Sequence, residues 1–459
     1  MDRDPLAKLR RRTILLAGLG LENKALALYL SQRDIRFSVA DSQVLSQTAY
    51  DALSWHPQVH RWHLGPDYLN HLSQYDLIVR TPGLPVLHPH LQAAQTRGSQ
   101  LTSQTQIFWD LCPAPIVGVT GTNGKGTTSS LLAHLLQTGP YRRVFLGGNI
   151  GVPPIGFAHQ LEDTDLVILE LSSFQLQDLD RSPQLALALP VGTDHLDYHR
   201  DRAEYVEAKT TIWRRQNPAD QLVLAADCPT VSTWTAGRAQ AYFFSANTPL
   251  EQGAWLTPDQ LLLRLGQSPP QRIGQRADIP LRGPHNHTNA AAAALAAALV
   301  GASTAQISAA LPTFQGLPHR LERVGQYRSV AYYNDSLATS PEAACAALSS
   351  FTEPLVLIAG GASKGADFTA MGQAIAKGGV RVLLLLGEEG PRIAEAAKKA
   401  GADLEYITTC RDMAQAVAQA RQQAQPGEVV LLAPACASFG LFTDYKDRGD
   451  QFKQLVRKG

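Results

Sequence analysis

The chain has 459 residues, of which 44% are hydrophobic and 18% charged, and its formal net charge is +1 at pH 7. These values are typical of a soluble globular protein with two to four domains. Because so small a net charge creates no long-range field, the composition argues against a nucleic acid or an anionic membrane as a partner. Five cysteines without a C-x-x-C pair suit a reducing compartment better than a disulfide framework.

The amino-terminal sequence MDRDPLAKLRRRTILLAG places a basic cluster before a short apolar strand. It lacks the long apolar region and the small-residue cleavage site of a signal peptide, so we expect a cytoplasmic protein. The most apolar stretch, residues 289–302, is nearly all alanine and too short to cross a bilayer. We therefore expect a packed helix there and no insertion into a membrane.

Short apolar runs alternate with helical patterns along most of the chain, which predicts βαβ units and parallel sheets. In a first block we expect strands at 13–18, 37–41 and 76–83, with a helix from about residue 23 to 33. A second block begins near residue 104 and reaches its first strand in PIVGVTG. It continues through strands at 165–171 and 185–192 to the alanine-rich helix.

A third block follows FQGLPHR and repeats the alternation through VAYYN, PLVLIAGG, VRVLLLLG, LEYITT and EVVLLAPA. We therefore predict an α/β protein of three domains. The first, 1–103, is Rossmann-like; the second, 104–316, has the parallel sheet of a P-loop ATPase; the third, 317–459, is again Rossmann-like.

Residues 117–128 read VGVTGTNGKGTT, a strand that feeds a glycine-rich turn and then a helical run. Backbone N–H groups at a helix start favour anions, and Lys125 adds a full positive charge, so this segment predicts a phosphate-binding loop. A Walker-type loop has a hydroxyl after its lysine, but here Gly126 follows. The alternative is an ordinary strand-to-helix turn with a surface lysine.

Polar side chains also follow two further apolar strands. The run LVILEL delivers Glu170 at a strand end, and LALALPVGTDH delivers Asp194 and His195 just past another. Ligands collect at the carboxyl ends of parallel strands, and a carboxylate and an imidazole beside phosphates suit Mg²⁺. Taken singly, Glu170 could be a helix-capping acid and His195 a loop histidine.

Many short motifs occur in an order that resembles the ATP-dependent Mur ligases of peptidoglycan synthesis, most closely the members that add D-glutamate. The resemblance covers nearly the whole chain. The motifs are GLGLEN (18–23), TPG (81–83), TGTNGKGTT (120–128), GGNIG (147–151), ELSSFQL (170–176), TDHLDYH (193–199), EAK (207–209), HNHTN (285–289), GLPHRLE (316–322), NDS (334–336), GGASKGADF (360–368) and PACASF (434–439).

The resemblance implies an amide ligase that takes ATP, UDP-N-acetylmuramoyl-L-alanine and D-glutamate. ATP would phosphorylate a carboxylate to an acyl phosphate, which the amine attacks to give a tetrahedral intermediate that expels phosphate. Positioning and charge neutralisation carry most of the catalysis in such a transfer. The resemblance also implies two Mg²⁺ ions, a lysine that can be carbamylated to become a metal ligand, and a monomer.

Site residues follow from the resemblance, position by position. Lys125, Glu170, His195 and Lys209 match catalytic residues, and Thr127, Glu170, His195 and carbamylated Lys209 match metal ligands. For Lys209 the alternative is a solvated helix lysine. The residues that match ATP contacts are Gly121, Thr122, Asn123, Gly124, Lys125, Gly126, Thr127, Thr128, Asn286, Asn289, Arg320 and Asp335.

Two further sets match the other substrates. Residues Leu21, Glu22, Asp41, Ser42, Gly83 and Asn149 match the contacts to the uridine nucleotide. GLGLEN lacks the third glycine of a dinucleotide fingerprint, so it is weak evidence for NAD. Thr339, Lys364 and Ser438 match contacts to D-glutamate, and a lysine with two hydroxyls suits a dicarboxylate.

Three positions depart from the family pattern. Leu337 stands where a lysine is usual, Pro190 where an asparagine is usual, and Gly126 where a hydroxyl is usual. They put metal stoichiometry and rate in question more than fold or reaction. Our hypothesis is that Gly126 lets the first helical turn adjust so that the Thr127 hydroxyl serves the metal.

Several other functions stay open at this point. A folylpolyglutamate synthase is favoured by GTNGKGT and disfavoured by the uridine-type first domain. A Mur ligase for another amino acid is the next alternative, although the third domain lacks the DNPR motif of the diaminopimelate-adding enzyme. From other classes, a nicotinamide dehydrogenase would need NAD in the first block, and an inactive nucleotide-binding regulator would be consistent with the three departures.

Overall fold

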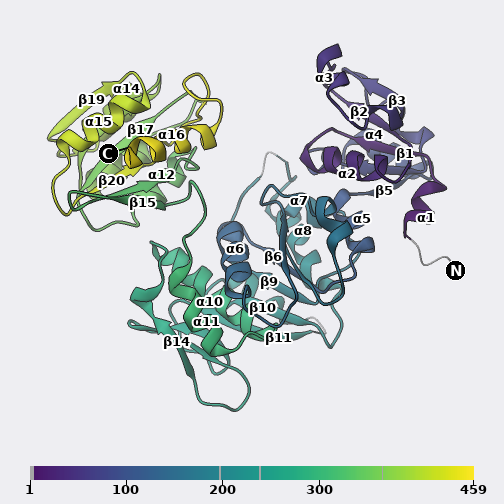
Figure 1. Ribbon diagram of the computed structural model, residues 1–459, viewed down its shortest axis with the longest axis horizontal. Coiled ribbons are helices and arrows are strands. Elements are labelled where there is room, and N and C mark those ends of the chain that lie inside the picture. The colour runs from purple at the N-terminus through teal and green to yellow at the C-terminus, as the bar shows by residue number, and fades with distance from the viewer. Residues whose placement is uncertain (1–4, 196–197, 237–238, 364, 459) are drawn as a thin grey trace. The chain divides into compact units, whose positions relative to one another are not determined.

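The computed structural model describes residues 5–195, 198–236, 239–363 and 365–458. The chain divides into two compact units. Figure 1 labels helices and strands of both units. Unit 1 comprises Met1–Arg276 and Thr288–Ala310, and unit 2 comprises Ala277–His287 and Leu311–Gly459. Among the described residues, unit 1 contains two α/β sheets and unit 2 contains one, which confirms the predicted three-domain α/β fold. The domain borders at 103 and 316 stay a prediction.

The first sheet is parallel throughout, with strand order β3-β2-β1-β4-β5. Its central strand is an apolar run whose four residues are all buried. The strands are β1 (Ile14–Ala17), β2 (Phe37–Asp41), β3 (Val59–Leu64), β4 (Leu77–Arg80) and β5 (Gln100–Thr102). The helices are α1 (Pro5–Arg10), α2 (Leu21–Ser31), α3 (Gln47–Asp51) and α4 (Pro89–Thr96). Because β1 lies between β2 and β4, the turns that follow these strands meet at one sheet edge.

The second sheet of unit 1 has the order β14-β13-β12-β11-β10-β9-β6-β8-β7. It is parallel from β7 to β12, and β13 and β14 add an antiparallel edge. The strands are β6 (Ile116–Thr120), β7 (Val144–Gly148), β8 (Leu166–Glu170), β9 (Leu185–Ala188), β10 (Gln221–Ala225), β11 (Gln240–Ser245), β12 (Gly253–Leu256), β13 (Gln260–Arg264) and β14 (Gln271–Gln275). The phosphate-loop strand β6 thus lies between the strands that lead to Glu170 and to His195.

Helices of the central region are α5 (Gln104–Leu111), α6 (Lys125–Leu135), α7 (Ser173–Leu176), α8 (Arg202–Arg214), α9 (Pro229–Ser232), α10 (Pro284–Leu299) and α11 (Thr304–Ala310). In α10 the run Ala290–Ala297 is fully buried, so the alanine-rich stretch is the packed helix expected from the sequence. Within the described residues we find no helix with the length and apolarity needed to span a membrane.

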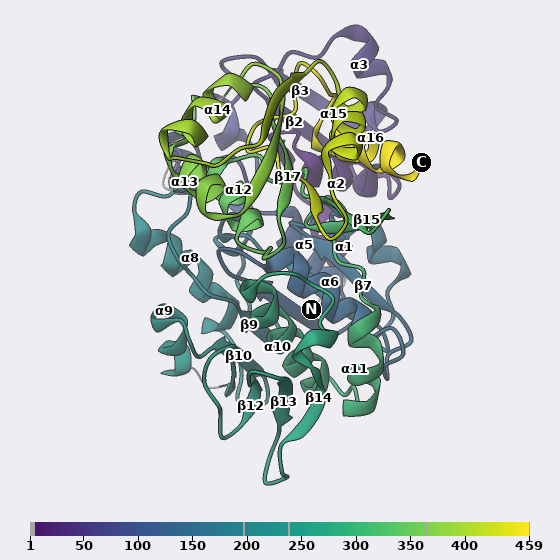
Figure 2. The same cartoon turned by 90° about the vertical axis from the view of Figure 1, so that its left-hand side faces the viewer.

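Unit 2 has the strand order β15-β16-β20-β17-β18-β19, antiparallel only between β15 and β16. Its strands are β15 (Glu322–Tyr327), β16 (Val330–Asn334), β17 (Leu355–Gly360), β18 (Val380–Leu386), β19 (Tyr406–Cys410) and β20 (Val429–Leu432). Its helices are α12 (Pro341–Leu348), α13 (Thr369–Lys377), α14 (Gly390–Lys399), α15 (Met413–Gln423) and α16 (Tyr445–Arg457). Figure 2 shows α12, α13 and α14 on one face of this sheet and α15 and α16 on the other, where each group closes a separate apolar core.

Short 3-10 helices complete the described structure. They lie at His56–Gln58, Leu72–Gln74, Pro154–Gln160, Trp234–Ala236, Arg276–Asp278 and Leu311–Thr313.

Candidate active site

The phosphate loop leaves β6 at Thr120 and enters α6 at Lys125, as the sequence predicts. Gly121 has φ +150° and Gly124 has φ +84°, conformations that favour glycine. There is also no room for a side chain at either residue. A Cβ would lie 2.6 Å from Leu189 Cβ at Gly121 and 2.4 Å from Asn289 Oδ1 at Gly124. The side chain of Asn289 therefore lies directly against the phosphate loop within unit 1.

Two lysine ammonium groups converge on one carbonyl of this loop. Lys125 Nζ donates to the carbonyl oxygens of Gly121, at 3.1 Å, and Thr122, at 2.9 Å. Lys209 Nζ, from α8, donates to the same Gly121 oxygen at 2.9 Å. Lys209 is only 1% exposed, so the alternative of a solvated helix lysine is wrong.

This arrangement makes Lys209 unusually easy to deprotonate. Burial, and then the positive charge of Lys125, lower the pKa of Lys209 to about 7, although the carboxylates of Asp194 and Glu170 oppose the shift. The Lys209 Nζ also lies 4.7 Å from the centre of the Tyr205 ring. Near neutral pH, Lys209 is therefore an uncharged amine in a large fraction of the protein molecules, and an uncharged amine is a nucleophile.

Glu170 ends β8 beside the loop and is 5% exposed. Its Oε1 accepts a hydrogen bond from Asn149 Nδ2 at 2.8 Å, so it is oriented by a neighbouring strand end rather than used as a helix cap. On α6, the buried Oγ1 of Thr128 has no hydrogen-bond partner among the described residues. A buried hydroxyl left without a partner is costly, so this atom fits a bound oxyanion or its counter-ion.

The oxygen atoms at this strand edge suit a Mg²⁺ ion that is also bound by phosphates and water. They do not suit a metal site made of protein side chains alone. Across residues 5–195, 198–236, 239–363 and 365–458, no group of three His, Cys, Asp or Glu side chains is arranged around a metal position. In phosphoryl-transfer sites Mg²⁺ is held by one or two carboxylates together with substrate phosphates and water. Glu170 is a carboxylate at this edge, and the Thr127 side chain is buried in the first turn of α6, so both fit the expected ligand set.

The loop after β9 brings His195 to the same edge. His195 has φ +53°, and its side chain is 44% exposed, with Nε2 lying 3.4 Å from Asp194 Oδ2. Its ring also lies 4.8 Å from that of Phe174 in α7. Pro190, one of the three departures from the family pattern, contributes its carbonyl oxygen, which accepts from the Thr122 N–H at 3.0 Å.

The turn after β1 is held from two sides. Asp41 Oδ2 accepts from the Leu19 N–H at 2.6 Å, and its Oδ1 accepts from the Gln43 N–H at 2.8 Å. Gly18 and Gly20 pack against Thr81, where a Cβ would approach side-chain atoms to 2.4 Å and 2.6 Å. The turns after β1, β2 and β4 thus form one cluster.

Four other residues expected to contact uridine, Leu21, Glu22, Ser42 and Gly83, lie at or beside this cluster. Leu21 is 59% exposed, which suits contact with a flat base, and Ser42 and Gly83 lie in the turns that follow β2 and β4. Glu22 is partly buried, and its Oε1 accepts from Gln175 Nε2 at 2.6 Å. Asn149 lies in the other sheet of unit 1, at the end of β7.

In unit 2, Asp335 follows β16 and is 7% exposed. Burial raises its pKa to about 6, and the Leu321 N–H and the charge of Arg320 oppose the shift. Asn286 is also buried, and its Nδ2 donates to the Arg282 carbonyl at 2.6 Å. These three expected ATP contacts, Asn286, Arg320 and Asp335, therefore belong to unit 2, whereas Asn289 belongs to unit 1.

Backbone hydrogen bonds gather the expected amino-acid contacts at the strand ends of unit 2. The Ala435 N–H donates to the Ala338 carbonyl at 2.9 Å, and the Ala362 N–H donates to the Ala437 carbonyl at 3.0 Å. These bonds join the segments that carry Thr339 and Ser438 to the start of the GGASKGADF loop. Lys364 lies outside the described residues.

Three family models match the chain. They are the Mur ligase MurD-like N-terminal domain over residues 12–103, the Mur ligase middle domain over 119–297, and the Mur ligase glutamate ligase domain over 319–436. A UDP-N-acetylmuramoylalanine–D-glutamate ligase of Symbiobacterium thermophilum is 41% identical over 98% of both chains. The chain belongs to the Mur ligase family.

Solved structures share the fold of this Mur ligase. The UDP-N-acetylmuramate-alanine ligase MurC of Thermotoga maritima aligns with a TM-score of 0.58 and 18% identity, over 97% of this chain and 99% of that one. A MurF ligase of Thermotoga maritima, solved in complex with ADP, aligns with a TM-score of 0.57 and 15% identity, over 94% and 98%. At these identities the likeness concerns the fold.

Sequence reasoning missed two buried arginines that hold the loops of this Mur ligase. Arg80 ends β4 and Arg448 lies in α16, and both are 0% exposed. The only sequence signal for Arg80 is an arginine that ends the apolar run LIVR. Arg448 lies in a polar helix sequence, where no comparable signal indicates that this arginine is buried.

Proposed function

We propose that this Mur ligase joins D-glutamate to UDP-N-acetylmuramoyl-L-alanine at the cost of ATP, a step in the synthesis of peptidoglycan precursors. The observation that carries the choice of substrates is the full-length match to a D-glutamate-adding relative, which is 41% identical over 98% of both chains. The MurD-like model over residues 12–103 supports the uridine nucleotide in the first domain and argues against a folylpolyglutamate synthase.

The chemistry is the transfer of a phosphoryl group followed by amide formation. A carboxylate oxygen of the alanyl group attacks the γ-phosphorus of ATP, and ADP leaves. The deprotonated amine of D-glutamate then attacks the acyl phosphate carbon, and phosphate leaves from the tetrahedral intermediate. We propose that Lys125 and the N–H groups at the start of α6 neutralise charge that spreads over the phosphoryl oxygens.

The proposed Mg²⁺ ligands are Thr127, Glu170, His195 and a carbamylated Lys209. Bound Mg²⁺ would supply positive charge next to the phosphates. In the unmodified protein the Lys209 ammonium repels a divalent cation, whereas a carbamate at its Nζ would add oxygen ligands. The Asn149 amide holds one oxygen of Glu170 and leaves the other available.

Carbamylation of Lys209 is supported by its low pKa. The neutral amine adds to CO₂, forms an N–C bond and releases one proton. Because the pKa of Lys209 is about 7, about half of the protein molecules carry a neutral Lys209 amine at pH 7. We expect ¹³C-bicarbonate to give a carbamate NMR signal in the wild type and none in Lys209→Arg. The same signal in both proteins, or none in either, would refute the modification.

We propose that the turn cluster at Leu21, Glu22, Asp41, Ser42 and Gly83 receives the uridine nucleotide, with Asn149 from the second sheet. Thr339, Lys364 and Ser438 are proposed to receive the two carboxylates of D-glutamate. Asn286, Asn289, Arg320 and Asp335 are proposed to contact the nucleoside of ATP. We also propose that the enzyme acts as a monomer in the cytoplasm, where ATP is available; light scattering coupled to size-exclusion chromatography tests the monomer.

A phosphate-release assay with a panel of acceptors tests the function. We expect release only when ATP, UDP-N-acetylmuramoyl-L-alanine and D-glutamate are all present. Release with L-glutamate and a folate would instead indicate a folylpolyglutamate synthase, and release with another amino acid would indicate a different Mur ligase. No release with any acceptor would favour a regulator or a dehydrogenase and would overturn the proposal.

A further inference from the structure

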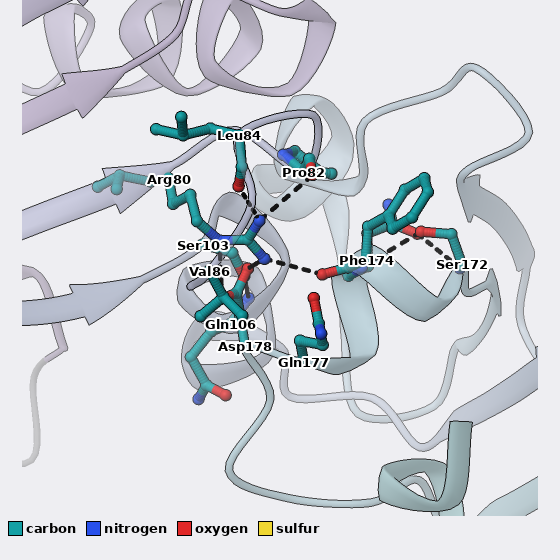
Figure 3. Close-up of polar contacts among 12 residues, drawn as sticks. Arg80, Pro82, Leu84, Val86, Ser103, Gln106, Ser172, Phe174, Gln177 and Asp178 are labelled. Carbon is teal, nitrogen blue, oxygen red and sulfur yellow. Dashed lines mark hydrogen bonds and ion pairs between the residues drawn. The ribbon is translucent and has the colours of Figure 1, made fainter. Parts of the chain in front are cut away.

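All three guanidinium nitrogens of Arg80 donate hydrogen bonds, although this residue lies in none of the proposed contact sets; Figure 3 shows several of these bonds. Its Nε and Nη2 donate to the two carboxylate oxygens of Asp178 at 3.1 Å and 2.6 Å. Nη2 also donates to the Phe174 carbonyl at 2.9 Å. Nη1 donates to the carbonyls of Pro82, at 3.2 Å, and Leu84.

The hydroxyl of Tyr198 completes this cluster. Arg80 Nη1 donates to Tyr198 Oη at 2.7 Å, and Tyr198 Oη donates in turn to the Pro82 carbonyl at 2.9 Å. We call Arg80, Asp178 and Tyr198, with the carbonyls of Pro82, Leu84 and Phe174, the Arg80 cluster. Its two charged side chains are 0% and 4% exposed, so solvent screens their attraction little.

The cluster joins three segments that are far apart in sequence. The turn after β4 carries Gly83, α7 follows Glu170, and the Tyr198 N–H donates to the His195 carbonyl at 3.1 Å. The α7 residue Gln175 also donates to Glu22 in the turn after β1. One guanidinium therefore connects the turns proposed for the uridine nucleotide with the strand ends proposed for phosphoryl transfer.

A lysine at position 80 could not replace these bonds. Its ammonium has three hydrogens and no planar fork, whereas Arg80 uses five hydrogens on six acceptor atoms. At least two of those acceptors would lose their bond. The carbonyls of Pro82 and Leu84 flank Gly83. Without Arg80 they would depend on the Tyr198 hydroxyl, which lies 2.9 Å and 3.3 Å from them, so the turn would be held more weakly.

We infer that Arg80 is a positioning residue for the UDP-linked substrate: it fixes the 81–84 turn against α7 and Tyr198, so that the nucleotide and the carboxylate are placed together. This inference rests on the proposed function. It assigns to Arg80 a role in substrate affinity through the turn, and no contact with the reacting atoms.

Arg381 offers a matched control in unit 2. Its Nε and Nη2 bind both oxygens of Glu428 at 2.7 Å and 2.9 Å, and further donors reach Glu405 and the Gln423 carbonyl. Its side chain is 15% exposed. Arg381 and Glu428 lie at the amino ends of β18 and β20, away from the strand ends proposed for D-glutamate. Arg381→Lys thus damages a similar ion pair with no link to a substrate turn.

The experiment compares steady-state kinetics of Arg80→Lys and Arg381→Lys. For Arg80→Lys we expect KM for UDP-N-acetylmuramoyl-L-alanine to rise about tenfold or more, because the turn that carries Gly83 loses hydrogen bonds that fix it, while KM for ATP stays within about twofold. For Arg381→Lys we expect both constants within about twofold of wild type at a similar loss of stability.

Equal changes in both KM values, or an unchanged KM for the UDP-linked substrate in Arg80→Lys, would overturn the inference. If Arg80→Lys does not fold, Tyr198→Phe removes one bond of the cluster, and the same selective rise in KM, smaller in size, is expected. The wild-type assay distinguishes failure of the proposed function from failure of the positioning role. An inactive wild type refutes the proposed function. An active wild type, together with equal KM changes for both substrates in Arg80→Lys, refutes only the positioning role.

Discussion

The two units each bury an arginine completely but surround it differently. Arg80 in unit 1 faces the carboxylate of Asp178, and burial lowers its pKa less than Asp178 and Tyr198 raise it, so the pKa of Arg80 lies above its usual value. Arg448 in unit 2 donates to Ser336 Oγ, the Ser336 carbonyl and the Cys436 carbonyl at 2.8–3.0 Å. Burial lowers the pKa of Arg448 to about 10.

The difference concerns what each arginine holds together. In the part of the chain that the structure describes, no carboxylate forms a hydrogen bond with Arg448, and this side chain joins the NDS and PACASF segments through neutral acceptors. The Arg80 cluster joins three segments and contains a buried negative charge. Removing a guanidinium should therefore cost much more where a carboxylate is left behind.

The largest expected effect is that of Arg80→Met. It leaves Asp178 buried without its partner. We expect the free energy of unfolding of unit 1 to fall by about 3–5 kcal/mol at pH 8. Urea unfolding followed by circular dichroism measures the loss. The double variant Arg80→Met/Asp178→Leu removes both charges and should recover a large part of it, because a buried pair replaced by apolar groups often costs little.

The same variant has a pH dependence of known sign. Burial already raises the pKa of Asp178, and without Arg80 the folded-state pKa must rise further above the unfolded value. A raised folded pKa gives stability that is present at low pH and lost as the pH rises through the folded value. The deficit of Arg80→Met should hence be smaller at pH 5 than at pH 8, and equal deficits would argue against a buried unpaired carboxylate.

The second prediction concerns Glu22, a partly buried residue of unit 1 whose buried Oε2 has no hydrogen-bond partner among the described residues. Burial raises the pKa of Glu22 to about 7, so its protonated form stabilises the fold below the unfolded value of 4.5, and this stability is lost as the pH rises to 7. Glu22→Gln should be more stable than wild type by about 2–3 kcal/mol at pH 8, with little difference at pH 4. Thermal unfolding at the two pH values measures this, and a pH-independent difference would contradict it.

Arg448→Met tests the other side of the comparison. It leaves two carbonyls and one hydroxyl without a donor but no buried charge, so we expect a loss of about 1–3 kcal/mol. The loss should be the same at pH 5 and pH 8, because neither Ser336 nor a backbone carbonyl titrates there. Urea unfolding at both pH values is the measurement, and a loss as large as that of Arg80→Met would remove the distinction between the two arginines.

Tyr198→Phe is expected to have the smallest effect, about 1 kcal/mol. The Arg80 Nη1 group keeps the Pro82 and Leu84 carbonyls as acceptors, so no donor of the guanidinium is left alone. Urea unfolding of the single variant, and of Tyr198→Phe in the Arg80→Met background, measures the coupling. If the hydroxyl belongs to the cluster, its removal should cost less in that background; equal costs in both would show that it acts independently.

Much of the fold and of the phosphate-loop region follows from local sequence pattern. The loop at Gly124 and Lys125 follows an apolar strand, and Glu170 ends another, so both were placed at a sheet edge from the sequence. The burial of Lys209 was not predictable, because it depends on how α8 packs beside β6. Whether Lys209 is carbamylated stays a prediction, as do the roles of the other site residues.

The Arg80 cluster shows what local pattern leaves out. Arg80 and Asp178 are 98 residues apart, and nothing in the sequence around either residue indicates that the two are in contact. Their meeting depends on how the first sheet of unit 1 lies against α7, which no strand or helix periodicity encodes. In the same way Arg448 reaches Ser336 over a separation of 112 residues.

The central claim is that a sugar-linked carboxylate is activated by ATP and captured by D-glutamate. The most direct measurement uses UDP-N-acetylmuramoyl-L-alanine labelled with ¹⁸O in the alanyl carboxylate, with ATP and D-glutamate, and mass spectrometry of the products. We predict a product that carries one glutamyl residue and keeps one of the two ¹⁸O atoms, while the other ¹⁸O atom appears in the phosphate released. Phosphate without ¹⁸O, or no glutamyl product, would contradict the account.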